Sequence, residues 1–257
     1  MHRTSAHPTE FTGRAALVTG SASGIGLAVA RRLAAGGADV AVADINEKGA
    51  RSVAHELREA YGTRAVAVGL DVTDPASVET AVRTTVDELG ALDLAVNNAG
   101  IGGPVAPLHH YPLDEWRRVI DTNLDGVFHS LRYELPAMLA AGGGAIVNMG
   151  SSCSTNGFPG VAAYAAAKHG VIGLTKTAAL EYAARGVRIN AIVPGFIETP
   201  LLADASDAER AHLVGLHPAG RLGTADEVAE MAAFLLSERS SFVNGSYHLV
   251  DGAYSAQ

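Results

Sequence analysis

The sequence is poor in cysteine and in long apolar runs, and each scarcity excludes a class of protein. A single cysteine, Cys153, occurs among 257 residues. An internal disulfide framework is therefore excluded, and a reducing compartment, the cytoplasm, is expected. No apolar run is long enough to cross a bilayer, and the polar start MHRTSAHPTE lacks the apolar middle of a secretory signal. We therefore expect no membrane partner.

Positive charge is scarce as well. The formal net charge is −8, whereas binding to nucleic acid requires a cationic face, so we expect no nucleic-acid partner. The basic doublets Arg31–Arg32 and Arg117–Arg118 are interpreted as solvated helix faces. The ten histidines show no metal-ligand spacing such as HExxH, so we expect no metal. His109, His110 and His217 are interpreted as solvated loop residues.

What is present is an alternation of short apolar runs with longer amphipathic segments. Glycine is abundant, with 29 residues, and aromatic residues make up only 5%. This composition suits alternating strands and helices better than a β-sandwich. The apolar runs predict strands at 15–19, 39–43, 65–69, 92–96, 145–149, 187–193 and 247–250. The segments between them predict helices near 24–36, 46–61, 75–89, 113–140, 161–185 and 225–236.

The predicted strands are apolar on both faces, which is typical of parallel strands covered by helices on each side. We therefore predict one α/β domain over residues 1–257, with a Rossmann-like, doubly wound parallel sheet. Residues 195–220 interrupt the alternation with a long, proline-containing segment that holds a short helical stretch. This segment is either a substrate lid or a simple surface excursion.

A glycine-rich loop, TGSASGIG at 19–26, joins the first predicted strand to the first helix. Its glycines allow close approach to a pyrophosphate, and the helix N-terminus favours negative charge. No lysine follows, which excludes an ATP-type phosphate loop. Asp44 ends the second strand, where a carboxylate could bind the adenosine ribose and repel a 2′-phosphate; Ala22, Ser23 and Ile45 add no positive charge. We therefore expect NAD, unless Asp44 only caps the next helix.

Tyr164 and Lys168 lie four residues apart in an alanine-rich helical stretch, so they share one helix face. A free tyrosine has a pKa of about 10, too high for ready proton exchange at neutral pH. A nearby ammonium group stabilises the phenolate and is expected to lower that pKa, which would make Tyr164 a usable acid and base. The sequence has only three lysines, at 48, 168 and 176.

Ser151 follows the fifth predicted strand, where its hydroxyl could orient a substrate carbonyl or alcohol. It lacks the Gly-x-Ser-x-Gly context of a hydrolase nucleophile. Asn123 lies within the 113–140 pattern, where asparagine has poor helix propensity. It could bend that helix and hold a water beside Lys168, or it could be an ordinary polar surface position. Cys153 is interpreted as a small buried residue that lines the pocket.

Taken together, these motifs identify a family resemblance. In order and spacing the chain resembles the classical short-chain dehydrogenases/reductases over essentially its whole length. The matching motifs are TGSASGIG (19–26), Asp71-Val72, NNAG (97–100), Asn123 in TNLDGVF, Ser151, Tyr164-AAA-Lys168, Pro194-Gly195 and Val250-Asp251-Gly252.

The resemblance implies a catalytic tetrad of Asn123, Ser151, Tyr164 and Lys168. In this tetrad Tyr164 exchanges the proton and Ser151 orients the substrate oxygen. Lys168 tunes Tyr164 and holds the cofactor ribose, and Asn123 holds a proton-relay water. Ile197 and Thr199 are expected at the nicotinamide amide. The full set of implied cofactor contacts is Gly20, Ser23, Gly24, Ile25, Gly26, Asp44, Ile45, Asp71, Val72, Asn98, Ala99, Gly100, Tyr164, Lys168, Pro194, Gly195, Ile197 and Thr199.

The resemblance also implies a homotetramer, built through the helices at 113–140 and 161–185 and the C-terminal strand. The chain departs from the family pattern at two positions. Gly150 stands where a serine is frequent, and Ala253 replaces a frequent second glycine after Asp251.

The functional prediction is an NAD(H)-dependent oxidoreductase that interconverts a secondary alcohol and a ketone. A group of apolar residues near the motifs indicates an apolar or cyclic substrate: Phe158, Val161, Phe196, Leu201 and Leu202. Two alternatives remain. A dinucleotide-sensing protein without turnover would have no need of the intact tetrad, and an NAD-dependent sugar epimerase or dehydratase would need a larger C-terminal domain.

Overall fold

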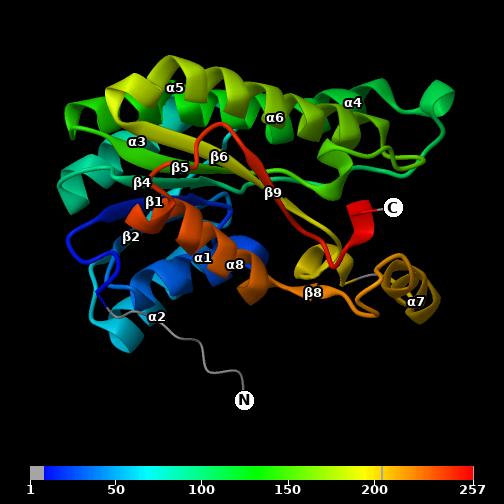
Figure 1. Cartoon of the computed structure of the whole chain (residues 1–257), viewed down its shortest axis with the longest axis horizontal. Helices are drawn as coiled ribbons and strands as arrows, with labels where there is room; N and C mark the ends of the chain where they lie inside the picture. The colour runs from blue at the N-terminus through cyan, green and yellow to red at the C-terminus, as the bar shows by residue number, and fades with distance from the viewer. Residues whose placement is uncertain (1–8, 204, 257) are drawn as a thin grey trace.

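One parallel sheet with helices on both faces forms the protein in the computed structural model, which describes residues 9–203 and 205–256 (Figure 1). Its strand order is β3-β2-β1-β4-β5-β6-β9, and all neighbouring pairs are parallel. The predicted doubly wound α/β fold is confirmed. The strands are β1 Ala15–Thr19, β2 Asp39–Asp44, β3 Ala65–Gly69, β4 Leu94–Asn97, β5 Gly144–Met149, β6 Val187–Pro194 and β9 Tyr247–Val250.

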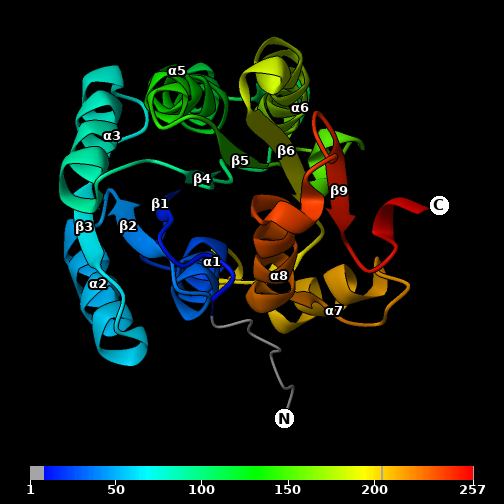
Figure 2. The same ribbon diagram turned by 60° about the vertical axis from the view of Figure 1, so that its left-hand side comes forward.

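Two helical layers enclose the sheet (Figure 2). One layer contains α1, α2 and α8, and the other contains α3, α5 and α6. Alternate strand residues point to opposite layers, so Val18 packs toward α1 and its neighbour Leu17 toward α3 and α5. The helices are α1 Gly24–Ala35, α2 Glu47–Tyr61, α3 Pro75–Leu89, α5 Gly126–Ala140, α6 Ala162–Tyr182 and α8 Ala225–Leu236. Within the two described ranges, no helix is both long and apolar enough to cross a membrane.

The segment predicted as one helix over 113–140 is interrupted. It consists of α4 Leu113–Ile120, a π-helical turn at Asp121–Asp125, and α5. The wide turn is centred on Asn123, whose side chain is fully buried. A π-turn inside a helix is rare and often marks a functional site. The helix is therefore irregular at Asn123, and the alternative of a polar surface position is wrong.

The connections that follow the strands gather at one end of the sheet. Strand β1 pairs with β2 on one side and with β4 on the other, so the strand order reverses there. Such a switch point opens a crevice at the carboxyl ends of the strands. Above it lie the short strands β7 Ile197–Glu198 and β8 Gly223–Thr224, which pair with each other, and helix α7 Asp207–Gly215. Helix α7 is the short helical stretch predicted within 195–220.

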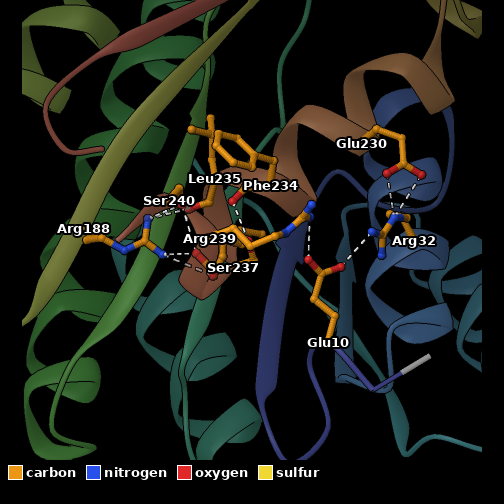
Figure 3. Close-up of polar contacts among 10 residues, drawn as sticks. Glu10, Arg32, Arg188, Glu230, Phe234, Leu235, Ser237, Arg239 and Ser240 are labelled. Carbon is orange, nitrogen blue, oxygen red and sulfur yellow. Dashed lines mark hydrogen bonds and ion pairs between the residues drawn. The ribbon is translucent and has the colours of Figure 1, made fainter. Parts of the chain in front are cut away.

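The opposite end of the sheet contains a cluster of buried ionic groups (Figure 3). Arg32 of α1 is only 8% exposed and forms ion pairs with Glu10 at 2.8 Å and with Glu230 of α8 at 3.0 Å. The preceding Arg31 is half-exposed and pairs with Glu56. The prediction of a solvated doublet is therefore wrong for Arg32, because α8 and the N-terminal segment cover that face of α1.

Arg188, at the start of β6, occupies the same end of the molecule (Figure 3). Its guanidinium donates hydrogen bonds to the carbonyl oxygens of Leu235, Leu236 and Ser237, and to the Ser240 hydroxyl. The last carbonyls of a helix have no partner within the helix and carry partial negative charge. Arg188 therefore caps α8 and fixes the end of that helix to the sheet.

Ala253, one of the two departures noted in the sequence, adopts a left-handed backbone. Its φ is +70°, and among the described residues other than glycine it alone has a positive φ. Glycine reaches this region without steric cost, whereas a Cβ makes it unfavourable. The turn after Asp251 therefore keeps the conformation that a glycine would favour, in spite of the alanine.

Candidate active site

A cavity of about 800 Å³ runs along the carboxyl ends of the strands, across the point where the strand order reverses. It receives residues from the segments after β1, β2, β3, β4, β5 and β6 and from the first turns of α6. All predicted site residues line it except Gly26. The tetrad and the predicted cofactor contacts are thus brought together in one cleft. The lining members are Gly20, Ser23, Gly24, Ile25, Asp44, Ile45, Asp71, Val72, Asn98, Ala99, Gly100, Asn123, Ser151, Tyr164, Lys168, Pro194, Gly195, Ile197 and Thr199.

The glycine loop begins at one end of this cleft, where β1 passes into α1. Gly20 and Gly24 have φ values of +63° and +56°, which only glycine adopts readily. A Cβ on Gly26 would lie 2.2 Å from the carbonyl oxygen of Gly20, so Gly26 serves the packing of the loop and not the cavity wall. The N-cap, Ser23, makes no side-chain cap bond. The first amides of α1 are therefore suited to bind a pyrophosphate, as a dinucleotide requires.

Asp44 stands beside this loop at the end of β2. Its carboxylate accepts hydrogen bonds from the backbone N–H of Ala22 at 2.9 Å and of Asn46 at 2.8 Å. The N-cap of α2 is Asn46, whose side chain accepts from Gly49 N–H. The alternative that Asp44 only caps the next helix is therefore wrong. Next to it, Ile45 is 76% exposed and lines the cavity without adding charge.

Two further segments form the middle of the cleft. After β3, the Asp71 carboxylate accepts from the N–H and the hydroxyl of Thr73, which fixes the turn that presents Val72. After β4, Asn98 donates from its side chain to the carbonyl oxygens of Thr19 and Gly20. The NNAG segment is thereby held against the glycine loop, and the two segments line the cleft together.

Asn123 holds the next segment of the cavity wall in place through hydrogen bonds. Its Nδ2 donates to the carbonyl oxygens of Ile101 and Val119, each at 2.9 Å, and its Oδ1 accepts from Ile101 N–H at 3.2 Å. A Cβ on Gly100 would lie 2.6 Å from that Oδ1. Both amide hydrogens of Asn123 are already donated to carbonyl oxygens of the protein. A relay water could therefore bind this side chain only by donating a hydrogen bond to its Oδ1.

Ser151, Tyr164 and Lys168 meet at the centre. Ser151 follows β5, and its Oγ accepts from Cys153 N–H at 3.2 Å. Tyr164 and Lys168 lie on the first turns of α6, with the Lys168 Nζ 5.7 Å from the Tyr164 ring centroid. Nζ also donates to the Met149 carbonyl oxygen at 2.7 Å. The spacing of four residues does place both side chains on one helix face, as predicted.

Desolvation dominates the ionisation of this pair. It raises the pKa of Tyr164 to about 12, and the neighbouring Ser151 side chain acts in the opposite direction. Desolvation also lowers the pKa of Lys168 to about 8, although a negative charge on Cys153 would raise it. Removal from water disfavours each charged form. The expected lowering of the Tyr164 pKa is therefore not met in this geometry, since burial raises that pKa and Lys168 is not among the groups that shift it.

The far wall comes from the segment after β6. Gly195 leaves room for His217, because a Cβ there would lie 2.8 Å from the histidine Nε2. His217 is only 4% exposed; its Nε2 accepts from Phe196 N–H, and its Nδ1 bonds the Leu213 carbonyl oxygen. The prediction of a solvated loop histidine is therefore wrong for His217, which joins α7 to the end of β6. His109 and His110 are exposed, as predicted.

The substrate end of the cleft is apolar. Phe158, Val161, Phe196 and Leu202 line it, and Cys153 is buried beside them, as predicted. The side chain of Leu201 lies outside the described structure. Phe158 and Phe196 face each other edge to face with ring centroids 5.8 Å apart. An apolar ring of a substrate could pack here next to Ser151 and Tyr164.

Sequence reasoning missed part of the wall. Some of these residues directly follow the NNAG motif, and others precede Asn123 or lie on α7. The first two groups could have been found from their neighbours in sequence, whereas α7 reaches the cavity only through the tertiary fold. The missed residues include Gly102, Gly103, Val105, Arg118, Thr122 and Leu213. In the part of the chain that the structure describes, no group of three or more His, Cys, Asp or Glu side chains is placed to hold a metal ion.

Known proteins match the chain over nearly its whole length. The family profile described as enoyl-(acyl carrier protein) reductase matches residues 20–255. A cyclohexanol dehydrogenase of Acinetobacter sp. (strain SE19) is 50% identical over 248 residues, which cover 96% of this chain and 97% of the relative. A cis-4-hydroxycyclohexanecarboxylate dehydrogenase of Sinomonas cyclohexanicum is 48% identical, covering 96% and 98%. The crystal structure of a levodione reductase superposes with a TM-score of 0.92 at 39% identity, covering 96% and 99%.

Proposed function

Because the chain belongs to the classical short-chain dehydrogenase/reductase family, we propose that it interconverts an apolar, cyclic secondary alcohol and its ketone with NAD(H) as the cofactor. The chain is an alcohol dehydrogenase or carbonyl reductase that uses a nicotinamide dinucleotide. Neither the sensor nor the sugar epimerase alternative has an observation in its favour, since the relatives above are named as dehydrogenases and a reductase.

The substrate class rests on the apolar wall beside Ser151 and Tyr164. Phe158 and Phe196 present aromatic surface there, and Leu202 adds aliphatic surface. A hydrocarbon ring gains from leaving water for such a wall, whereas a polyol or a phosphate would lose hydrogen bonds to water. Two of the relatives are named for substrates that contain a cyclohexane ring. Both observations support a cyclic alcohol.

The choice of NAD rests on Asp44. Its carboxylate is fixed in the cleft by two backbone amides, next to the uncharged Ile45. A fixed negative charge at this position accepts hydrogen bonds from ribose hydroxyls and repels a 2′-phosphate. The glycine loop and the uncapped start of α1 suit the pyrophosphate of either dinucleotide, so Asp44 alone carries the distinction.

The chemistry follows from the positions of three side chains. When bound, the nicotinamide supplies the acceptor or donor of the hydride. Ser151 donates its hydroxyl hydrogen to the substrate oxygen, and the bond that its Oγ accepts from Cys153 N–H holds the hydroxyl in place. Tyr164 takes the alcohol proton on its oxygen during oxidation and returns it during reduction. Lys168 provides the positive charge next to the phenol and holds the ribose, while Asn123 fixes the Ile101 segment of the wall.

The segment over 195–220 acts as a substrate lid in this proposal. None of the residues 207–215 of α7 is fully buried, so this helix has few contacts to break when it moves. Leu202 and Leu213 line the cavity from this segment. Closure would remove water from the substrate end, which strengthens the electrostatic interactions at Tyr164. A homotetramer completes the proposal, and the lone free thiol, Cys153, suits the reducing cytoplasm.

The test is a panel of alcohols with NAD and NADP in parallel: cyclohexanol, an open-chain secondary alcohol, a polyol and a sugar phosphate. We expect turnover of cyclohexanol with NAD to be the fastest. Tyr164→Phe should lower it by at least about 100-fold, because the proton acceptor is removed. Tyr182→Phe, at the other end of α6, is the matched control and should leave turnover unchanged. A preference for the polyol, for the sugar phosphate or for NADP would contradict the proposal.

A further inference from the structure

The turn after β5 contains two serine hydroxyls in a reciprocal arrangement. Ser151 N–H donates to the Ser154 Oγ at 3.1 Å, and Cys153 N–H donates to the Ser151 Oγ at 3.2 Å. The first bond fixes the Ser151 backbone, and the second orients its hydroxyl. Ser154 is only 4% exposed, so water cannot easily replace its hydroxyl as the acceptor for Ser151 N–H.

Gly150 gives this arrangement its space. Its own N–H donates to the Ile192 carbonyl oxygen at 2.7 Å, which holds it against β6. A Cβ on Gly150 would lie 2.9 Å from the Ser154 Oγ and 2.9 Å from the Ile192 oxygen. Real Cβ atoms do not approach so closely, so a side chain at 150 would displace the Ser154 hydroxyl. Gly150 therefore leaves room for both the Ser154 hydroxyl and the Ile192 carbonyl oxygen.

We propose that Ser154 is a positioning residue for Ser151, and that position 150 requires glycine because the Ser154 hydroxyl and the Ile192 carbonyl oxygen fill the space that a side chain there would need. The inference rests on the proposed function, since it assumes that Ser151 orients the substrate oxygen. Loss of the hydroxyl leaves Ser151 N–H without a buried acceptor, and the turn shifts to recover one. A shift of this kind misaligns the Ser151 hydroxyl, and reaction rates depend steeply on such alignment.

The hydrogen bond from Ser151 N–H to the Ser154 hydroxyl can be tested without cofactor or substrate. Amide hydrogen exchange of Ser151 N–H should be slow in the wild-type protein and should accelerate in Ser154→Ala. In Ser152→Ala it should stay slow. Ser152 is the matched control, because it is equally buried in the same turn but its hydroxyl is not part of the reciprocal pair. Unchanged exchange in Ser154→Ala would overturn the inference whatever the enzyme turns over.

The kinetic test compares Ser154→Ala with Ser151→Ala and with the double variant. We expect Ser154→Ala to lower kcat by about tenfold, the effect of one misaligned hydrogen bond, with NAD affinity unchanged. Ser154→Thr, which keeps the hydroxyl, should retain most of kcat. In the Ser151→Ala background, Ser154→Ala should not lower kcat any further, because Ser154 acts through Ser151.

The outcomes separate the two proposals. If Ser151→Ala keeps full turnover, the role of Ser151 in the proposed function fails. If Ser151→Ala loses turnover while Ser154→Ala keeps it, only the positioning role fails. A tenfold loss from Ser154→Ala that persists in the Ser151→Ala background would also contradict positioning, since it indicates a general effect on the turn.

Discussion

Three ionisable side chains in or next to the cleft are held where their charged forms are disfavoured. Tyr164 and Lys168 have pKa values of about 12 and about 8. Glu134 of α5 is fully buried, and its pKa is raised to about 7 because burial disfavours the carboxylate. Asn97 donates to one of its oxygens at 3.0 Å, and its other oxygen has no hydrogen-bond partner among the described residues. Desolvation is thus the main electrostatic influence at this scale.

The Tyr164 pKa predicts opposite pH dependence for the two directions of the reaction. Oxidation needs the phenolate as proton acceptor, and with a pKa of about 12 that form is scarce at neutral pH. We expect kcat/KM for alcohol oxidation to rise from about pH 6 to about pH 8, above which Lys168, with a pKa of about 8, loses the charge that stabilises the phenolate. Ketone reduction needs the phenol, so its kcat/KM should stay flat or fall. Initial rates in both directions across this range check the prediction; a flat profile for oxidation would be incompatible with it.

Glu134 predicts a pH dependence of stability. Its folded-state pKa of about 7 lies above the usual 4.5, so the folded state binds more protons between these values. The stability that the protonated form provides is complete below about pH 4.5 and is lost as the pH rises through about 7. Glu134→Gln removes this loss and should raise the free energy of unfolding at pH 8 by about 3 kcal/mol. Urea denaturation at pH 5 and pH 8 tests this, with the exposed Glu88→Gln as control; equal pH dependence in wild type and Glu134→Gln would refute it.

At the scale of elements, the packing of α1 against α8 depends on one buried guanidinium. Arg32 joins α1 to Glu230 of α8 and to Glu10 of the N-terminal segment (Figure 3). Glu10 is also bound by Arg239, which follows α8. A charge removed from water in this way is stable only while its partners are present. The cluster therefore couples three segments that are far apart in the sequence.

Neighbouring arginines allow a matched test of this coupling. Arg32→Met leaves buried Glu10 with one partner fewer and should lower the free energy of unfolding by about 3 kcal/mol. Arg31→Met removes only a half-exposed pair with Glu56 and should cost less than about 1 kcal/mol. Both values come from urea denaturation at the same protein concentration. Equal losses in the two variants would show that the buried cluster adds nothing to the packing of these helices.

At the scale of the whole molecule, exposed apolar residues occur on two groups of elements: the helical layer with α5 and α6, and the edge strand β9, which lie on different sides of the fold (Figure 2). The helical surface consists of Leu113, Phe128 and Leu180 on α4, α5 and α6; the edge surface consists of Phe242, Tyr247 and Leu249 at β9. Large apolar side chains left exposed on a helical layer and on an edge strand suit contacts with other copies of the chain. Two separate surfaces suit two kinds of two-fold contact, which together build a tetramer.

The proposed homotetramer predicts a specific response to a charge on the edge surface. We expect the wild-type protein to elute as a tetramer in light-scattering chromatography. Leu249→Asp should reduce it to dimers, because the helical surface remains intact while the edge surface gains a charge that would be buried. Tyr61→Asp, at the end of α2 and away from both surfaces, should leave the tetramer unchanged. A monomeric wild-type protein would refute the assembly.

The sequence alone determined the order of strands and helices and the identity of the cleft. Strands buried on both faces need apolar residues throughout, so they appear in the sequence as short apolar runs. The turn that would hold a dinucleotide needs glycines, so it appears as the TGSASGIG motif. The predicted tetrad came from the resemblance to a known family, and only the Tyr164–Lys168 pair has the spacing of one helix turn.

Only the tertiary structure decided which polar groups are buried. Arg32 and His217 looked like surface residues, because their sequence neighbours do not reveal that α8 covers the first and the segment after β6 covers the second. The Tyr164 pKa depends on how much water the surrounding elements exclude, and the link between Gly150 and Ser154 depends on a carbonyl of β6. Burial is a sum over segments distant in the sequence, so no local pattern contains it.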